Sequence, residues 1–184
     1  VGSEMCIRDS TVDNITHGKA AIYNYGTLII QGGMYTRSLE TQDCVDDGAD
    51  NSWYTVVNVG TMTINDGFFT TADGQPENLG NRSSLIRNGD GTSPGNLTIS
   101  DGTFVSGANV IKNEPGSVIE AITGGTFTMD NSKIAWYGGN NLLQSYGTIK
   151  TISGGVFKAL GDGLSIDEDA SYYRQGIGVY EDGK

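Results

Sequence analysis

The chain has 184 residues, a length typical of a single domain, and a formal net charge of −11. So acidic a chain repels phosphate backbones and anionic lipid surfaces, which makes nucleic acid an unfavourable partner. No apolar run approaches the roughly 18 residues that span a bilayer, so we expect no membrane insertion within this sequence. Glycine is abundant, at 28 residues, whereas only 3 prolines are present, which excludes a proline-rich linker.

Residues 1–10, Val-Gly-Ser-Glu-Met-Cys-Ile-Arg-Asp-Ser, resemble the translation of a transposon-library sequencing adapter. Segments that derive from a cloning or sequencing procedure are set aside in fold reasoning. We therefore expect residues 1–10 to be an artefact outside the fold. The source is then expected to be a metagenomic read, with a natural chain that continues beyond both ends.

From residue 26 onward a repeated segment recurs, in which glycine and threonine precede alternating apolar residues, a glycine corner and an aromatic residue. Its five copies are Gly26-Thr-Leu-Ile-Ile-Gln-Gly-Gly-Met-Tyr35, Gly60-Thr-Met-Thr-Ile-Asn-Asp-Gly-Phe-Phe69, Gly95-Asn-Leu-Thr-Ile-Ser-Asp-Gly-Thr-Phe104, Gly116-Ser-Val-Ile-Glu-Ala-Ile-Thr-Gly-Gly-Thr-Phe127 and Gly147-Thr-Ile-Lys-Thr-Ile-Ser-Gly-Gly-Val-Phe157. Copies four and five carry two and one extra residues. A repeat of this size cannot bury an apolar face alone, so the copies must stack.

The alternation within each copy predicts a β-strand with one buried face. Leu28 and Ile30 are two residues apart and share a face, whereas Ile29 points the other way. Stacking places Ile30 over Ile64 and Ile64 over Ile99 in one continuous column. The fold class predicted is an all-β solenoid, a single-stranded parallel β-helix of about five rungs, with the aromatic of each copy re-entering the core.

A second strand precedes each copy and ends in a polar residue. Asparagine holds that place in four copies and serine in the fifth, at Asn24, Asn58, Asn88, Asn113 and Ser145. Asparagine suits the turn that follows, and stacked amides can form a hydrogen-bonded ladder. We predict a structural ladder at these four asparagines; a row of ligand-binding amides is the alternative.

The copies resemble the "GTLTISGGTF" repeats of large bacterial surface proteins and, more broadly, the right-handed parallel β-helix of the pectate-lyase-like superfamily. The resemblance covers about residues 11–158 and implies a right-handed coil, and we expect the β-helix repeats to occupy residues 11–160. A left-handed hexapeptide helix is disfavoured because no tandem six-residue period occurs. Residues 161–184 depart from the repeat and are expected to form a truncated cap or exit segment.

Acidic residues gather in one insertion, at Asp43, Asp46, Asp47 and Asp50. Carboxylate oxygens are ligands for Ca²⁺, but this spacing matches neither the EF-hand nor the nonapeptide of calcium β-rolls. A solvated acidic loop is the alternative, and no other cofactor is indicated. Basic residues are scattered, and none recurs in register beside an acidic pair, as a polysaccharide lyase would need.

Two aromatic pairs, Trp53-Tyr54 and Trp136-Tyr137, lie in insertions just before the strand that ends in the ladder residue. Such side chains stack on flat ligands, so both pairs are candidate carbohydrate contacts, although they could equally cover the side of the solenoid.

The resemblance implies a non-enzymatic structural or adhesion module, extracellular or at the cell surface, whose partners are a glycan, a host or cell-wall surface and flanking domains of the same polypeptide. The alternative is a polysaccharide lyase or glycoside hydrolase with its active rungs elsewhere or in the acidic loop.

Overall fold

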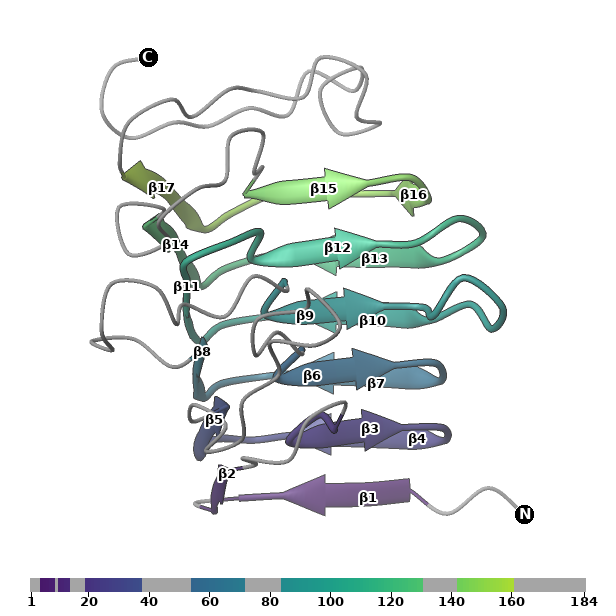
Figure 1. The fold of residues 1–184 in the computed structure, drawn as a ribbon, viewed down its shortest axis with the longest axis horizontal. Coiled ribbons are helices and arrows are strands. Elements are labelled where there is room, and N and C mark those ends of the chain that lie inside the picture. The colour runs from purple at the N-terminus through teal and green to yellow at the C-terminus, as the bar shows by residue number, and fades with distance from the viewer. Residues whose placement is uncertain are drawn as a thin grey trace, which may run out of the picture.

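The computed structural model describes residues 4–8, 10–13, 19–37, 54–71, 84–130 and 142–160. These residues form strands and turns and contain no helix. The chain passes in turn through three parallel sheets, here called sheets A, B and C, and returns to the first sheet one layer further along the axis (Figure 1). The molecule is therefore an all-β parallel β-helix, as the sequence predicts.

The strands of each sheet are stacked along the axis, and every pairing between them is parallel. Sheet A contains β1 (Glu4–Ile7), β4 (Thr27–Ile30), β7 (Thr61–Ile64), β10 (Asn96–Ile99), β13 (Val118–Ile122) and β16 (Thr148–Ile149). Sheet B contains β2 (Thr11–Asp13), β5 (Met34–Arg37), β8 (Phe68–Thr71), β11 (Thr103–Ser106), β14 (Thr126–Asp130) and β17 (Val156–Leu160). Sheet C contains β3 (Ile22–Asn24), β6 (Val56–Asn58), β9 (Ile86–Asn88), β12 (Ile111–Asn113) and β15 (Leu143–Ser145).

The predicted aliphatic column runs through sheet A. Ile30 pairs in register with Ile64, and Ile64 pairs with Ile99; all three side chains are fully buried. Ile29 and Thr63 face outward on the same strands and are only half-buried. The period-two reading of the repeat is thus confirmed, and it works because a one-residue slip would turn the whole apolar set to solvent.

The aromatic residue that closes each copy lies in the core beneath sheet B, also as predicted. Adjacent rings stack nearly parallel, with centroids 4.7 Å apart for Tyr35 and Phe69, 5.0 Å for Phe69 and Phe104, and 4.7 Å for Phe104 and Phe127. Phe157 continues the column at 4.8 Å. Each such pair contributes about 0.5–1.5 kcal/mol beyond the burial of its area, so the column links the rungs along the axis.

The glycine corner before each aromatic is a steric requirement. Gly67 has φ +140°, and a Cβ at this position would lie 2.8 Å from Cε2 of Phe69. A side chain there would meet both a strained backbone and the ring that the corner delivers into the core.

The fourth copy begins one residue later than the sequence alignment places it. Val118 pairs with Asn96, so Ser117, and not Gly116, lies opposite Gly95. Gly116, with φ +80°, belongs instead to the preceding turn, in which the Ser117 amide donates to the carbonyl of Glu114 at 3.0 Å. The other extra residue forms a β-bulge in β13, a device that absorbs one residue without losing the register beyond it.

Part of the segment set aside from the fold is a strand of the solenoid in the structure. β1 pairs in parallel with β4, with Met5 opposite Leu28 and Ile7 opposite Ile30. This corrects the expectation that residues 1–10 lie outside the fold. The physical reason is that β4 would otherwise present a row of unpaired N–H and C=O groups, and an adjoining extended segment with alternating apolar residues satisfies them.

Candidate functional site

The ladder residues are the last residues of the sheet C strands, and their side chains face inward. Asn24 donates through Nδ2 to Oδ1 of Asn58, Asn58 donates to Asn88, and Asn88 donates to Asn113, each at 2.8 Å. Asn113 donates to Oγ of Ser145 at 3.0 Å. The four asparagines that the sequence marks as a ladder therefore stand in one hydrogen-bonded column.

Each ladder amide also donates to the first residue of the sheet A strand in the next rung. Nδ2 of Asn58 donates to the carbonyl of Asn96 at 3.1 Å, and Nδ2 of Asn88 donates to that of Val118 at 3.1 Å. Asn58, Asn88 and Asn113 are fully buried. Because a buried polar group without a partner costs about 1–3 kcal/mol, these amides are occupied in holding rungs together and are not free to bind a ligand.

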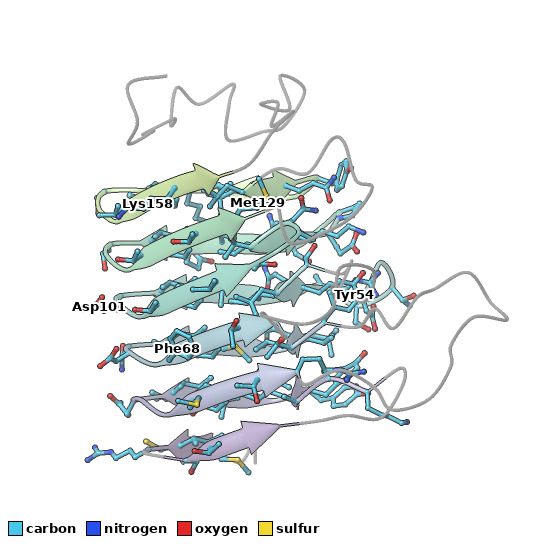
Figure 2. The ribbon with its side chains drawn as sticks, turned by 60° about the vertical axis from the view of Figure 1, so that its left-hand side comes forward. Tyr54, Phe68, Asp101, Met129 and Lys158 are labelled. Carbon is cyan, nitrogen blue, oxygen red and sulfur yellow. The ribbon has the colours of Figure 1, made fainter. Side chains whose placement is uncertain are left out.

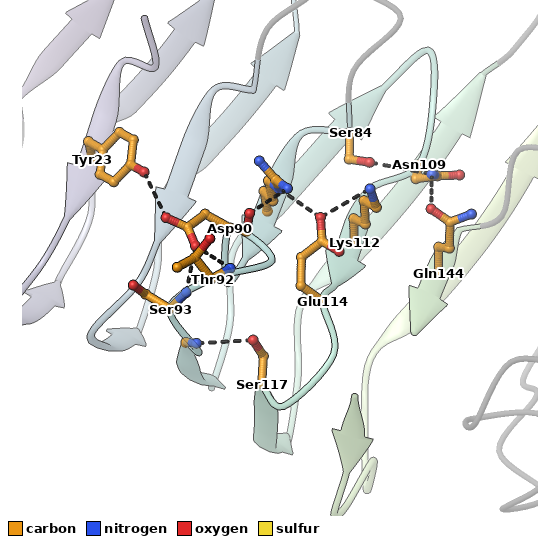
Figure 3. Close-up of polar contacts among 12 residues, drawn as sticks. Tyr23, Ser84, Asp90, Thr92, Ser93, Asn109, Lys112, Glu114, Ser117 and Gln144 are labelled. Atoms are coloured by element: carbon orange, nitrogen blue, oxygen red, sulfur yellow. Dashed lines mark hydrogen bonds and ion pairs between the residues drawn. The ribbon is translucent and has the colours of Figure 1, made fainter. Parts of the chain in front are cut away.

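The outward side chains of sheet C take part in a network of polar contacts with the neighbouring turns (Figure 3). Register aligns one residue from each strand; this column, called here the sheet C strip, consists of Tyr23, Val57, Arg87, Lys112 and Gln144. The corresponding outward positions of sheet A are mainly threonines. Tyr23 is 42% exposed, Arg87, Lys112 and Gln144 are half-buried, and Val57 is buried although it lies outside the apolar core.

Two cations of the strip share one carboxylate. Nε of Arg87 lies 2.7 Å from Oε1 of Glu114, and Nζ of Lys112 lies 3.0 Å from the same oxygen. The Glu114 side chain is only 8% exposed, whereas the two cations are 21% and 26% exposed. The arrangement fixes both cations while leaving each partly open to solvent.

The turn after β9 adds a second carboxylate beside Arg87. Oδ1 of Asp90 accepts from the amides of Ser93 at 2.7 Å and Thr92 at 2.8 Å. These amides, and to a lesser degree the Arg87 guanidinium, hold the pKa of Asp90 below its ordinary value. Nη2 of Arg87 donates to the carbonyl of Asp90 at 2.9 Å, so the turn and the strip are one connected network.

Aromatic side chains flank the strip at its N-terminal end. Tyr23 and Tyr25 stack with ring centroids 4.5 Å apart, and Tyr25 is 74% exposed. The Tyr23 hydroxyl reaches past the Val57 rung to Oδ2 of Asp90 at 3.5 Å. Partial burial, with smaller effects from Tyr25 and Asp90, raises the pKa of Tyr23, so its hydroxyl keeps its proton and remains a donor.

An amide cluster lies at the C-terminal end of the sheet C strip. Nδ2 of Asn109 donates to Oε1 of Gln144 at 3.0 Å and to Oγ of Ser84 at 3.3 Å. The bond to its oxygen orients the Gln144 amide, whose nitrogen is left to donate elsewhere.

The predicted site residues fall mostly outside the residues that the structure describes. Only Tyr54 of the aromatic candidates is described; Arg87 packs against its ring, with Cζ 5.1 Å from the centroid, so one face of this ring is occupied. The candidates outside the described residues are Asp43, Asp46, Asp47, Asp50, Trp53, Trp136 and Tyr137.

The described ranges contain no group of three or more histidine, cysteine, aspartate or glutamate side chains that could hold a metal ion. Nor does the described part of the chain include a helix long and apolar enough to cross a bilayer.

The Arg87–Glu114–Lys112 cluster is absent from the sequence predictions, although a signal for it exists. Arg87 and Lys112 each precede a ladder asparagine, so aligning the asparagines places the two cations on adjacent strands, facing outward. Glu114 directly follows Asn113 at the start of a turn whose length no other copy shares, and repeat alignment alone does not bring it back over the strip.

Comparisons with protein families, with curated proteins and with solved structures find no match to this chain.

Proposed function

We propose that the chain is a non-enzymatic structural and adhesion module of an extracellular or cell-surface bacterial protein, coiled in the right-handed sense. The observation that carries this proposal is that three columns run through successive rungs without a break: the aliphatic column, the aromatic stack and the asparagine ladder. A coil tied by three such columns resists bending, which suits a stalk that holds a binding surface or a flanking domain away from the cell.

Two further arguments support the right-handed coil and the extracellular location. Parallel crossover connections are right-handed in nearly all folds, which favours a right-handed coil. The likeness of the repeats to those of bacterial surface proteins favours an extracellular location. Partners proposed on this basis are glycans or proteins of a host or cell-wall surface, together with flanking domains of the same polypeptide.

A polysaccharide lyase or hydrolase is the second candidate, and one observation favours it. Arg87 and Lys112 lie side by side on an outward strand face with a carboxylate between them. A base beside a fixed charge is what proton abstraction from an acidic sugar needs. Against this candidate, Glu114 is buried and held by both cations, and hydrolysis needs two carboxylates set around the scissile bond.

Incubation with polygalacturonate and Ca²⁺ separates the two functions. We expect neither unsaturated product nor new reducing ends. Product that disappears in Lys112→Met or in Asp46→Ala with Asp47→Ala, but persists in Lys150→Met, would establish the lyase and overturn the structural proposal. Lys150 is a suitable control because it pairs with a glutamate on sheet A, away from the strip.

A further inference from the structure

The surface that best fits a partner is the sheet C strip with the tyrosine pair at its end, and its composition narrows the kind of partner. Tyr25 presents an aromatic ring that is 74% exposed, stacked on Tyr23. An exposed ring fixed by a neighbour loses little freedom on binding, and aromatic residues dominate the energetics of binding surfaces.

The hydrogen-bonding groups beyond the tyrosines are fixed in direction. Lys112 uses one of its three N–H donors on Glu114, and Arg87 uses Nε on Glu114 and Nη2 on the carbonyl of Asp90. Gln144 is oriented through its oxygen by Asn109. The strip therefore offers preset donors for hydroxyl oxygens without needing to rearrange.

The charges of the sheet C strip and of the turns beside it are balanced. Arg87 and Lys112 are matched by Glu114 and Asp90, whereas the whole chain carries a net charge of −11. An anionic ligand would gain little from the strip and would be repelled by the rest of the molecule. An uncharged ligand rich in hydroxyls is not repelled by the acidic molecule, and it can use the donors of the strip without needing a net positive charge.

The spacing of the strip suits a chain of repeating units. Successive outward side chains come from neighbouring strands about 4.7–4.9 Å apart along the axis. One pyranose of an extended polysaccharide advances by a similar length, so the sugars of a glycan lying along the axis keep step with the rungs. At the second rung they meet the Tyr23 side chain, which reaches past the buried Val57.

We infer that the outer face of sheet C is a binding site for an extended neutral glycan, with one sugar ring on Tyr25 and the hydroxyls of later sugar rings bonded to Arg87, Lys112 and Gln144. This inference rests on the proposed adhesion function and names its ligand class. It requires no turnover.

Binding is measured on the full chain by isothermal titration with cellohexaose, xylohexaose and mannohexaose, and with hexagalacturonate as the anionic comparison. We expect at least one neutral hexasaccharide to bind, and Tyr25→Ala to weaken that binding tenfold or more. Lys112→Met is expected to weaken it about threefold to tenfold, as the loss of one hydrogen bond does.

Phe68→Ala is the matched control. Phe68 is also an outward-facing aromatic residue, but it lies on sheet B, away from the strip. Its removal is expected to leave affinity unchanged.

Three results would overturn the inference: no binding to any neutral hexasaccharide, equal losses for Tyr25→Ala and Phe68→Ala, or tighter binding of hexagalacturonate through the same residues. Product formation in the polygalacturonate assay would instead refute the non-enzymatic proposal, and titration with uncleaved neutral sugars is independent of that result.

Discussion

The two faces of sheet C are made by the same five strands, yet they obey different rules. Inward, asparagine holds the ladder position of four strands, and Asn24, Asn58 and Asn88 each donate to the asparagine of the next rung. Outward, the five residues of the sheet C strip are all different. Residue types that recur from rung to rung therefore identify the positions that hold the coil together. Positions at which the residue type varies identify a surface on which a separate function can evolve.

The contrast between inward and outward positions also applies to sheet B, where two adjacent phenylalanines on opposite faces of β8 test it most sharply. Phe69 is fully buried between Tyr35 and Phe104, whereas Phe68 points outward and is half-buried (Figure 2). Phe69→Ala is expected to lower the free energy of unfolding by about 3–5 kcal/mol, through lost burial and a cavity. Phe68→Ala is expected to cost about 1 kcal/mol or less, as surface substitutions do. Urea denaturation measures both, and comparable losses would contradict the assignment of faces.

The ladder gives the next largest effect. Asn88→Ala removes the acceptor for one N–H of Asn58, whose Nδ2 keeps its bond to Asn96, and the donor to Oδ1 of Asn113, so two buried hydrogen-bonding positions lose a partner. The expected loss of stability is about 2–4 kcal/mol, from roughly 1–3 kcal/mol for each group.

Asn96→Ala is the control for the ladder, because among the described residues its side chain bonds to Glu120 alone, on the outer face of sheet A. Its effect is expected to stay within about 0.5 kcal/mol. Equal effects of the two substitutions would mean that the buried column is no more important than the surface.

The ion cluster on the outer face should matter less. Glu114→Gln keeps an acceptor for the two cations but removes the charge that neutralises them, so we expect a loss of about 1–3 kcal/mol. Glu120→Gln breaks the pair with Lys150, in which both side chains are about a third or more exposed, and is expected to change stability less than Glu114→Gln does, because solvent screens an exposed pair. Thermal denaturation of both variants at low and high salt distinguishes a buried cluster from a screened surface pair.

The smallest expected effect concerns pH. The amides of Ser93 and Thr92 lower the pKa of Asp90, so its stabilising contribution is present above the ordinary aspartate pKa of about 3.9 and is lost as pH falls through the lowered value. Asp90→Asn is therefore expected to differ from the parent chain most at neutral pH and progressively less in acid. A difference in melting temperature that is constant from about pH 6 down to pH 2 would show that the turn does not depend on this charge.

The sequence predicts what repeats and misses what does not. Ile30, Ile64 and Ile99 recur at the same place in their copies, so their column follows from period and copy number alone. Glu114 occurs once, in a turn of unique length, and reaches Arg87 only because the chain coils back beside β9. Alignment of the copies also places the start of the fourth copy one residue too early. Gly116 resembles the glycine that begins the other copies, but it belongs to the four-residue turn from Glu114 to Ser117.

The ladder amides all point the same way. From Asn24 to Asn113, each donates toward the C-terminal neighbour, so their dipoles add along the axis and give the rod a built-in polarity. Ser145 accepts the last of these bonds with a hydroxyl, which turns back to the carbonyl of Gly147 at 3.4 Å. A rung inserted in the interior could prolong this aligned series only if it brought its own asparagine, whereas a serine rung would act as a terminator. A single amide-to-hydroxyl exchange thus encodes how far the polarised array extends.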